Sequence, residues 1–255
     1  ALSDAEELVL QLFQYRFGND SDLEGHSFGN LYLSAMTAIT GSFEAALNES
    51  SRVLAVRGRV VPSTLAQVTL HADVLAPAGE ERAIWQRIRG ESAITAMRGQ
   101  VRRVYLEPEN PPAFPEAIRA ILAADLIVAG PGSLYTSVLP NLLVKDLVEA
   151  ITAAWGLKVY VCNVATEAGE TEGYDVNAHV RALQAHVGAG LFRTVLANNA
   201  FIGPAPPGIG VQWVRPPEQE PTDYRLIVRD LVDRQYPWRH DPAKLARALV
   251  ELIDV

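Results

Sequence analysis

The chain of 255 residues lacks several features that would assign it to common protein classes. Its one cysteine, Cys162, excludes an internal disulfide and is typical of a protein from a reducing compartment. No apolar run reaches the roughly 20 residues that a membrane-spanning helix requires. The N-terminus also lacks the charged and then apolar segments of a signal peptide. We therefore expect a cytoplasmic protein that does not insert into a membrane.

Positive charge is also scarce. The chain has 22 Lys and Arg residues against 30 Asp and Glu residues, which leaves a net charge of −8 at pH 7. Lysine occurs only at positions 145, 158 and 244, and the basic residues form no stripe. Because affinity for nucleic acids depends largely on neutralising phosphates, we expect no nucleic acid partner. A small polyanionic ligand is compatible with this charge, since a single pocket can be positive on an acidic protein.

No familiar catalytic motif is present. The sequence contains no serine–histidine–acid arrangement, no H-E-x-x-H and no C-x-x-C. Cys162 lies in the apolar run KVYVCNV and is expected to be a buried strand residue rather than a nucleophile. The residues identify neither a nucleophile nor a general base, so whether the chain is an enzyme stays open.

Helices and apolar strands alternate from residue 115 to the C-terminus. Strands are predicted at 126–129, 158–162, 194–197, 211–214 and 225–228, and helices at 115–124, 142–154, 176–187 and 242–253. Continuous apolar strands that alternate with helices are typical of a parallel sheet covered on both faces. We therefore predict an α/β fold, a Rossmann-like three-layer sandwich with a mostly parallel sheet.

Residues 1–107 follow a different pattern. A capping-box sequence at residues 3–6 predicts a helix that ends at Gly18, and two more helices are predicted at 27–40 and 42–55. Alternation at 68–74, with one solvated face, and the segments 84–94 and 101–106 predict strands. These form an inserted, partly antiparallel β-rich layer at 58–107, with polar turn material at 80–90. No repeat or long linker separates the parts, so we expect a single α/β domain over residues 1–255.

The segment 125–141, with the sequence DLIVAGPGSLYTSVLPN, carries the strongest functional signal. A short strand stops at Gly130, Pro131 and Gly132, and Ser133 and Tyr135 then offer hydroxyls beside backbone N–H groups. A strand that runs through a Gly-rich turn into a helix is typical of anion pockets, because the glycines admit a phosphate and the helix start supplies positive potential. The alternative is a tight turn in which Ser133 caps the helix.

A second strand end predicts another wall of the same cleft. Asn163 follows the strand at 158–162, and ligands of open parallel sheets lie at the carboxyl ends of the strands. If the two strands are neighbours, Asn163 and the loop that contains Thr166 share a crevice with the Gly-rich turn. Glu167, Glu170 and Glu172 could hold a metal ion or a ribose there, or simply face solvent.

Two N-terminal clusters admit both a binding and a structural interpretation. In the sequence GHSFGN, Ser27 can cap a helix, while His26 and Asn30 can bind a ligand or fasten a loop. Arg57 and Arg59 suit phosphate or carboxylate binding, but cations are equally favoured at the C-terminus of a helix.

The sequence YPWRHD at 236–241 is a third such cluster. An aromatic side chain here can stack on a base, and Arg239 can neutralise a phosphate. A helix N-cap at Asp241 followed by Pro242 explains the end of the segment without any ligand. That interpretation leaves Arg239 and His240 unexplained.

Six segments in this order resemble a known family: GHSFGN, RVLAVRGRVVPSTL, RVYLEPE, ADLIVAGPGSLYTSVLPNLLV, KVYVCNVATEAGETEGYDV and PWRHDPAKLARAL. They are similar to the gluconeogenesis factors, the bacterial branch of the CofD-like superfamily that contains the 2-phospho-L-lactate transferases. The resemblance covers essentially the whole chain, and the GPGSLYTS and VCN-x-x-T-x-x-GET blocks are specific to it. It implies a Rossmann-like core.

The resemblance also implies a function. It implies a cytoplasmic regulatory protein that binds a UDP-sugar, notably UDP-N-acetylglucosamine, and is linked to gluconeogenic growth, cell shape and cell-wall precursor supply. The alternative is a transferase like the sister branch, which uses a nucleotide diphosphate donor, a deazaflavin acceptor and Mg²⁺. No other cofactor is expected. We expect a homo-oligomer, and a scaffolding protein with a vestigial cleft is the third hypothesis.

One departure from the family concerns the start of the chain. Members normally begin with a Gly-rich strand–loop–helix followed by aspartates, and neither precedes Ala1 in this sequence. That loop is expected to bind part of the nucleotide phosphate, and the aspartates to help hold a metal ion. Carried over position by position, the resemblance implies ligand-binding roles for Gly130, Pro131, Gly132, Ser133, Tyr135, Asn163, Thr166, His26, Ser27, Asn30 and Arg239. It assigns no catalytic residue and no metal ligand.

Overall fold

The computed structural model describes residues 7–18, 22–55, 57–77, 83–97, 99–203, 207–208 and 210–253. The chain divides into two compact units, Ala1–Leu65 and Ala66–Val255. The predicted capping box at residues 3–6 and the first part of the predicted polar turn, residues 80–82, lie outside the described residues. Within the described part of the chain, no helix combines the length and the apolar character that crossing a bilayer requires.

The first unit contains the helices α1 (Glu7–Gln14), α2 (Phe28–Thr40) and α3 (Phe43–Val53). Serine caps begin two of them: the Ser27 hydroxyl accepts a hydrogen bond from the Asn30 amide, and Ser42 caps α3 through the Ala45 amide. Gly41 ends α2 in the left-handed region, at a φ of 82°, which favours glycine. The helices predicted at 27–40 and 42–55 are confirmed.

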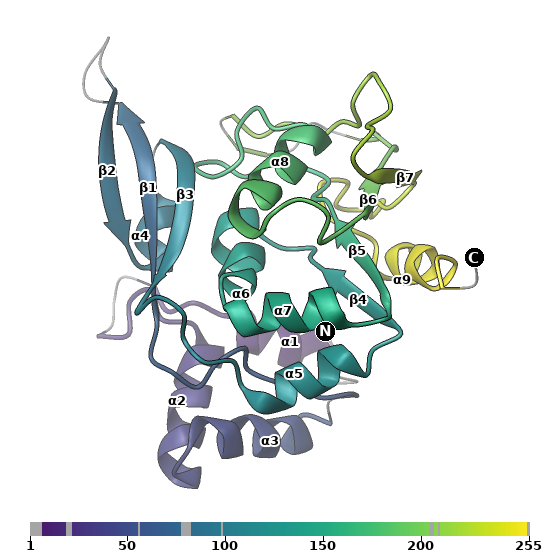
Figure 1. The fold of residues 1–255 in the computed structure, drawn as a ribbon. Coiled ribbons are helices and arrows are strands. Elements are labelled where there is room, and N and C mark those ends of the chain that lie inside the picture. Colours follow the sequence, from purple (N-terminus) through teal and green to yellow (C-terminus); the bar gives the residue numbers. More distant parts are fainter. Residues whose placement is uncertain are drawn as a thin grey trace. The chain divides into compact units, whose positions relative to one another are not determined.

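The second unit is built on a parallel sheet of four strands in the order β4-β5-β6-β7 (Figure 1). The strands are β4 (Leu126–Ala129), β5 (Leu157–Val161), β6 (Thr194–Asn198) and β7 (Arg225–Arg229). Each strand pairs in parallel with the next one along the chain, so the sheet grows in one direction. The predicted α/β fold with a parallel sheet is confirmed.

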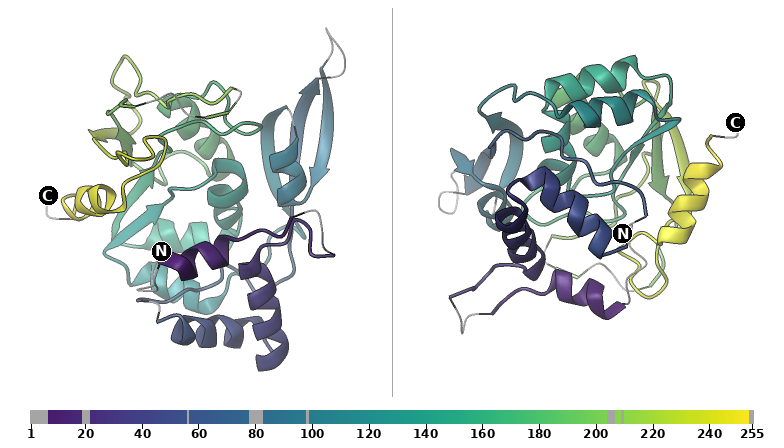
Figure 2. Two further views of the ribbon diagram at one scale, coloured as in Figure 1. Left: turned by 180° about the vertical axis from the view of Figure 1, so that it is seen from behind. Right: turned by 90° about the horizontal axis from the view of Figure 1, so that it is seen from below.

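Helices cover both faces of this sheet. They are α5 (Pro115–Leu122), α6 (Leu139–Leu142), α7 (Lys145–Ala153), α8 (Val176–Val187) and α9 (Pro242–Val250). Because crossovers between parallel strands are right-handed and the sheet grows in one direction, α7 and α8 lie on the same face. The closing helix α9 covers the opposite face (Figure 2), where Leu245 and Leu249 pack against Val159, Val161 and Leu196.

A separate antiparallel sheet has the order β2-β1-β3. It consists of β1 (Thr69–Pro77), β2 (Ala83–Arg89) and β3 (Gln100–Glu107), with the short helix α4 (Glu91–Ala96) on one side (Figure 1). The sheet falls within the region where the sequence predicts an inserted, partly antiparallel layer. His71, on the face of β1 that was predicted to be solvated, is only 8% exposed, because it stacks on Tyr105 and its Nε2 lies 2.7 Å from a carboxylate oxygen of Glu107.

Three local predictions are wrong. The strand predicted at 84–94 ends at Gly90, whose φ of 90° breaks the strand, and the remainder forms α4. The helix predicted at 142–154 is divided between α6 and α7, because Val144 adopts an extended conformation. The strand predicted at 211–214 is reduced to one bridge, between Ala165 and Trp213.

Candidate functional site

The carboxyl ends of β4 and β5 meet at one cavity of the second unit. The two strands are direct neighbours, with Ala129 opposite Tyr160, so the loops that follow them emerge side by side. The cavity has a volume of about 640 Å³. It is lined by Thr95, Pro131, Gly132, Asn163, Val164, Ala165, Thr166, Glu167, Ala168, Glu170, Pro207, Val211, Trp238, Arg239 and His240.

Glycine is required at the turn after β4. Gly130 has a φ of +88°, and a Cβ atom there would lie 2.8 Å from the carbonyl oxygen of Val161. The turn is tied to the neighbouring strand end, because the Gly132 amide donates to Oδ1 of Asn163 at 3.4 Å. The Asn163 side chain donates in turn to Oε1 of Glu167 at 3.3 Å. The two strand ends therefore form one hydrogen-bonded wall, as the sequence predicts for neighbouring strands.

The helix that follows the turn is a π-helix, η1 (Leu134–Val138), and its amino end is already occupied. The Tyr135 amide donates to Oε2 of Glu170 at 3.2 Å, and the Thr136 hydroxyl donates to Oε1 at 2.7 Å. Glu170 is only 3% exposed, and this burial raises the pKa of its carboxyl, an effect opposed by the hydrogen bond from Thr136. An internal carboxyl group thus takes donors that the sequence predicts for the anion of a ligand. Ser133 occupies the predicted N-cap position of η1, but its side chain makes no capping hydrogen bond there.

Glu167 brings a second carboxyl group to the cavity. Burial raises the pKa of Glu167, and a hydrogen bond with the side chain of Ser133 opposes that change. Its amide donates to the Thr171 hydroxyl at 2.9 Å, which holds the loop after β5. Thr166 is buried, its amide donates to the Gln212 carbonyl, and its hydroxyl accepts from the Gln212 amide, each at 2.8 Å. These hydrogen bonds give Thr166 a structural role in the wall of the cavity.

Tyr135 lies behind this wall. Its side chain is 1% exposed, and its hydroxyl lies 2.9 Å from the Tyr174 hydroxyl. Burial raises the pKa of Tyr135 well above its ordinary value, so the phenol stays protonated. The rings of Tyr135 and His186 also form a T-shaped contact, with 5.9 Å between ring centroids.

Another wall of the cavity comes from the segment between β7 and α9, residues 230–241, which we call the Arg239 loop. Arg239 is the one Lys or Arg side chain among the described residues that line the cavity. Its guanidinium lies over the ring of Tyr236, 5.6 Å from the centroid. Trp238 and His240 flank Arg239 on this wall. The wall therefore presents one cation beside an aromatic ring.

His240 is neutral at physiological pH. Burial lowers its pKa to about 4, although an imidazole N–H bonded to the Cys162 carbonyl acts in the other direction. Nε2 is buried and has no partner in the described part of the chain, so the bonded nitrogen is Nδ1. Cys162 is itself fully buried, and burial raises the pKa of its thiol, which makes it inert as a nucleophile. The sequence prediction of a buried cysteine is confirmed.

The structure thus brings five of the predicted residues to one cavity: Pro131, Gly132, Asn163, Thr166 and Arg239. Gly130 and Ser133 flank them in the same turn. His26, Ser27 and Asn30 lie in the first unit, where the Ser27 hydroxyl caps α2 and His26 is exposed. Their predicted contact with the ligand remains a prediction.

Sequence reasoning missed the role of Glu170 and the contribution of Thr95. Glu170 was a candidate ligand for a metal or a ribose, but it caps η1 instead. It lies 35 positions from Tyr135, and no local spacing signals such a contact. Thr95 comes from α4, beside the antiparallel sheet, which has no sequence motif linking it to the Gly-rich turn.

Two carboxyl groups, those of Glu167 and Glu170, line the cavity. Both carboxylate oxygens of Glu170 already accept hydrogen bonds from η1. Among the described residues, no group of three or more His, Cys, Asp or Glu side chains is arranged to hold a metal ion.

The chain is similar to known proteins over nearly its whole length. The gluconeogenesis factor of Bacillus subtilis is 43% identical over 264 residues, which are 99% of this chain and 80% of that protein. A relative from Nostoc sp., named "Putative gluconeogenesis factor", is 43% identical over 260 residues, or 98% of this chain, but the chain spans only 55% of that relative's length. The crystal structure of a UPF0052 family member from Bacillus halodurans superposes with a TM-score of 0.81 at 37% identity, covering 98% of this chain and 80% of that one.

The family described as 2-phospho-L-lactate transferase CofD matches residues 1–254. This match covers nearly the whole chain, and the relatives named as gluconeogenesis factors agree with it. The chain therefore belongs to the CofD family and, within it, to the gluconeogenesis factors.

Proposed function

We propose that this chain binds a nucleotide-sugar of the UDP-sugar class in the cavity between the Gly-rich turn and the Arg239 loop. The relatives are named gluconeogenesis factors, and we propose that the binding serves a regulatory role in gluconeogenic growth, cell shape and cell-wall precursor supply in the cytoplasm. The chain spans 80% and 55% of the length of the two relatives described above.

The observation that carries the proposal is the cavity itself. Its volume of about 640 Å³ lies within the roughly 300–1,000 Å³ typical of small-molecule sites, and it stands at the carboxyl edge of a parallel sheet. One wall offers the polar side chains of Asn163 and Glu167, which suit hydroxyl groups of a ribose or a sugar. The other wall offers the guanidinium of Arg239, which suits a phosphate because its planar fork matches the phosphate oxygens.

Calorimetric titration of UDP-N-acetylglucosamine into the full-length protein tests the proposal. Removing the guanidinium in Arg239→Ala is expected to weaken binding by about tenfold to a hundredfold, the usual contribution of a charge-assisted hydrogen bond. Arg119→Ala is the matched control, because the Arg119 side chain is 71% exposed, its guanidinium lies 3.5 Å from Oε1 of Glu116, and it does not line the cavity. No heat of binding at millimolar ligand, or equal affinity for both variants, contradicts the proposal.

The second candidate function is a transferase that uses a nucleotide diphosphate donor and a deazaflavin acceptor. The description of the matching family as a 2-phospho-L-lactate transferase favours it. Glu167 and Glu170 are the carboxyl groups that line the cavity in the described part of the chain, and Mg²⁺ in such enzymes is held by one or two carboxylates together with substrate phosphates. An assay of the full-length protein with donor, deazaflavin and Mg²⁺ decides: absence of product beside an active control transferase rejects this candidate.

A further inference from the structure

The Arg239 loop carries much of the proposed site, yet it contains no helix or strand. Residues 230–241 bring Trp238, Arg239 and His240 to the cavity. An irregular loop holds a side chain in one place only if its own backbone is fixed. The contacts that fix this loop therefore decide where the guanidinium of Arg239 lies.

The two ends of the loop lie against each other. The Asp233 amide donates to the Arg239 carbonyl at 2.9 Å, and the Asp241 amide donates to the Leu231 carbonyl at 2.8 Å. On the β6 side, Oδ1 of Asn198 accepts a hydrogen bond from the Leu231 amide at 3.2 Å. Asn198 is 1% exposed, so this anchor belongs to the core. The loop thus has a narrow stem, held on one side by the sheet.

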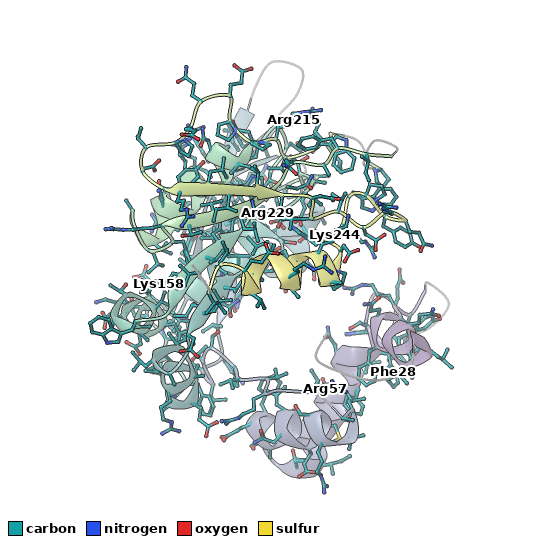
Figure 3. The ribbon with its side chains drawn as sticks, turned by 90° about the vertical axis from the view of Figure 1, so that its right-hand side faces the viewer. Phe28, Arg57, Lys158, Arg215, Arg229 and Lys244 are labelled. Carbon is teal, nitrogen blue, oxygen red and sulfur yellow. The ribbon has the colours of Figure 1, made fainter. Side chains whose placement is uncertain are left out.

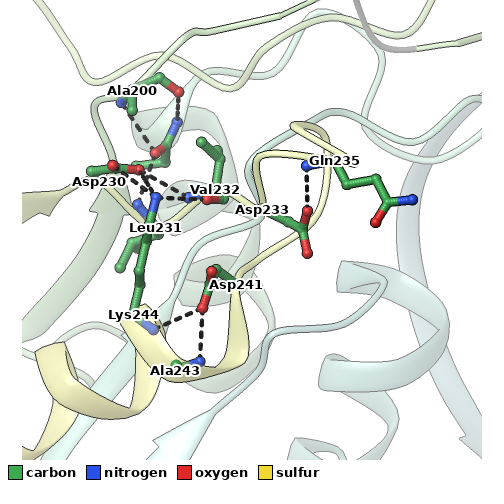
Figure 4. Close-up of polar contacts among 10 residues, drawn as sticks. Ala200, Asp230, Leu231, Val232, Asp233, Gln235, Asp241, Ala243 and Lys244 are labelled. Carbon is green, nitrogen blue, oxygen red and sulfur yellow. Dashed lines mark hydrogen bonds and ion pairs between the residues drawn. The ribbon is translucent and has the colours of Figure 1, made fainter. Parts of the chain in front are cut away.

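Lys244 holds the stem on the other side. Its ammonium group donates to Oδ1 and Oδ2 of Asp230, at 2.9 and 2.8 Å, and to the Val232 carbonyl at 2.9 Å (Figure 4). An ammonium group has three N–H donors, so all of them are used within the stem. The hydrogen bond from Lys244 lowers the pKa of Asp230, which keeps the carboxylate ionised.

The position of Lys244 suits this role. It stands in the first turn of α9, next to β7, from which the loop departs (Figure 3). Asp241 caps the same turn through the amides of Ala243 and Lys244, at 2.9 and 3.0 Å. Lys244 therefore contacts both ends of the loop: its ammonium group bonds Asp230 and Val232 at the start, and its amide bonds Asp241 at the end. Lys244 does not line the cavity, so any effect on a ligand acts through the loop.

We propose that Lys244 is a positioning residue for ligand binding: by joining Asp230 and the Val232 carbonyl to α9, it sets the Arg239 loop so that the Arg239 guanidinium faces the cavity. The consequence for affinity rests on the proposed function, whereas the consequence for the loop does not.

The first experiment needs no ligand. Amide hydrogen exchange is measured for Asp233 and Asp241 in the full-length protein and in Lys244→Met. Both exchange rates are expected to rise by about tenfold or more in Lys244→Met. The two amides donate the hydrogen bonds that join the ends of the loop, and these bonds open when the stem opens. Lys145→Met is the matched control, because Lys145 is exposed and lies 3.7 Å from Glu149. Unchanged protection in Lys244→Met overturns the inference, whatever the protein binds.

The second experiment separates position from charge, with UDP-N-acetylglucosamine as the probe. Lys244→Met is expected to weaken binding by about tenfold, because the loop is no longer preorganised. Asp230→Asn is the decisive variant, since it removes a negative charge and also weakens the stem. If Lys244 acted only as a cation near an anionic ligand, Asp230→Asn would tighten binding; a positioning role requires that it weaken binding.

A double-mutant cycle then distinguishes a positioning role from general destabilisation. Arg239→Ala is expected to cost much less affinity in the Lys244→Met protein than in the wild type, because the guanidinium is already displaced. Equal losses in the two backgrounds, or tighter binding by Asp230→Asn, overturn the inference while leaving the proposed function intact. Failure of the wild type to bind the probe refutes the proposed function instead, and the hydrogen-exchange result still decides the inference.

Discussion

Titration of His240 tests how tightly the cavity wall is packed. Burial holds the pKa of this imidazole at about 4, against 6.5 for an ordinary histidine, while its N–H bonds the Cys162 carbonyl. In the unfolded chain the imidazole is expected to titrate near its ordinary value. The folded state therefore binds a proton at His240 less readily than the unfolded state does.

The sign and size of the effect follow from that difference. Because the pKa of His240 is lower in the folded state, its contribution to stability is fully present above about pH 6.5 and is lost as the pH falls toward 4. The difference between 6.5 and about 4 corresponds to about 3 kcal/mol, at about 1.4 kcal/mol for each pKa unit. Protonation at low pH therefore favours unfolding by this amount.

Urea denaturation between pH 4 and pH 8 measures the effect when wild type is compared with His240→Asn. Asparagine removes the titrating group, and its side-chain N–H can replace Nδ1 toward the Cys162 carbonyl. The wild type is expected to lose about 3 kcal/mol more than the variant between pH 7 and pH 4. Burial also lowers the pKa values of His179 and His186, and the comparison cancels their contribution because both proteins contain them. Parallel stability curves for the two proteins would refute the burial argument.

Three further substitutions test the surroundings of the cavity by urea denaturation. Glu170→Ala leaves buried donors of η1 without a partner and is expected to cost about 3 kcal/mol, whereas Glu170→Gln keeps an acceptor and should cost clearly less; equal losses would contradict the capping role. Gly130→Ala combines a φ of +88° with a Cβ atom 2.8 Å from the Val161 carbonyl, so a loss of about 1–3 kcal/mol is expected, and a neutral result would show that the turn can relax. Asp241→Ala removes the N-cap of α9 and should cost about 1 kcal/mol, with Asp241→Asn as the variant that retains most of the stability.

Local signals predicted much of the fold. Ser27, Ser42 and Asp241 cap the helices that their positions indicate, because an N-cap depends on only three or four consecutive residues. The continuous apolar strands β4, β5 and β6 were found for a similar reason, since a strand of a covered parallel sheet leaves a compact apolar run in the sequence, even where it is only partly buried, as in β4. The parallel sheet followed from their alternation with helices.

The predictions failed where the local pattern was ambiguous or where the contact joins residues far apart in the sequence. The segment after β2 contains apolar residues at both strand and helix spacing, and only the left-handed Gly90 and the burial of Ile94 decide for α4. The contact between Glu170 and η1 joins residues 35 positions apart, which no local pattern encodes. Arg239 could be assigned to the cavity from the sequence only through a family resemblance. Its loop is fixed by hydrogen bonds from Lys244 and to Asn198, and Asn198 lies far from the loop in the sequence.

The capping of η1 by Glu170 changes where an anionic ligand can find positive charge. The sequence predicts that the Gly-rich turn and the helix start hold a pyrophosphate, but Glu170 takes donors of η1 and Asn163 accepts from the Gly132 amide. Glu167 adds a second carboxyl group to that wall. Under the proposed function, the phosphates therefore belong beside Arg239, and the Gly-rich wall serves hydroxyl groups of the sugar or ribose. It follows that affinity for the nucleotide should depend more strongly on the contacts that hold the Arg239 loop than on the hydroxyl of Ser133.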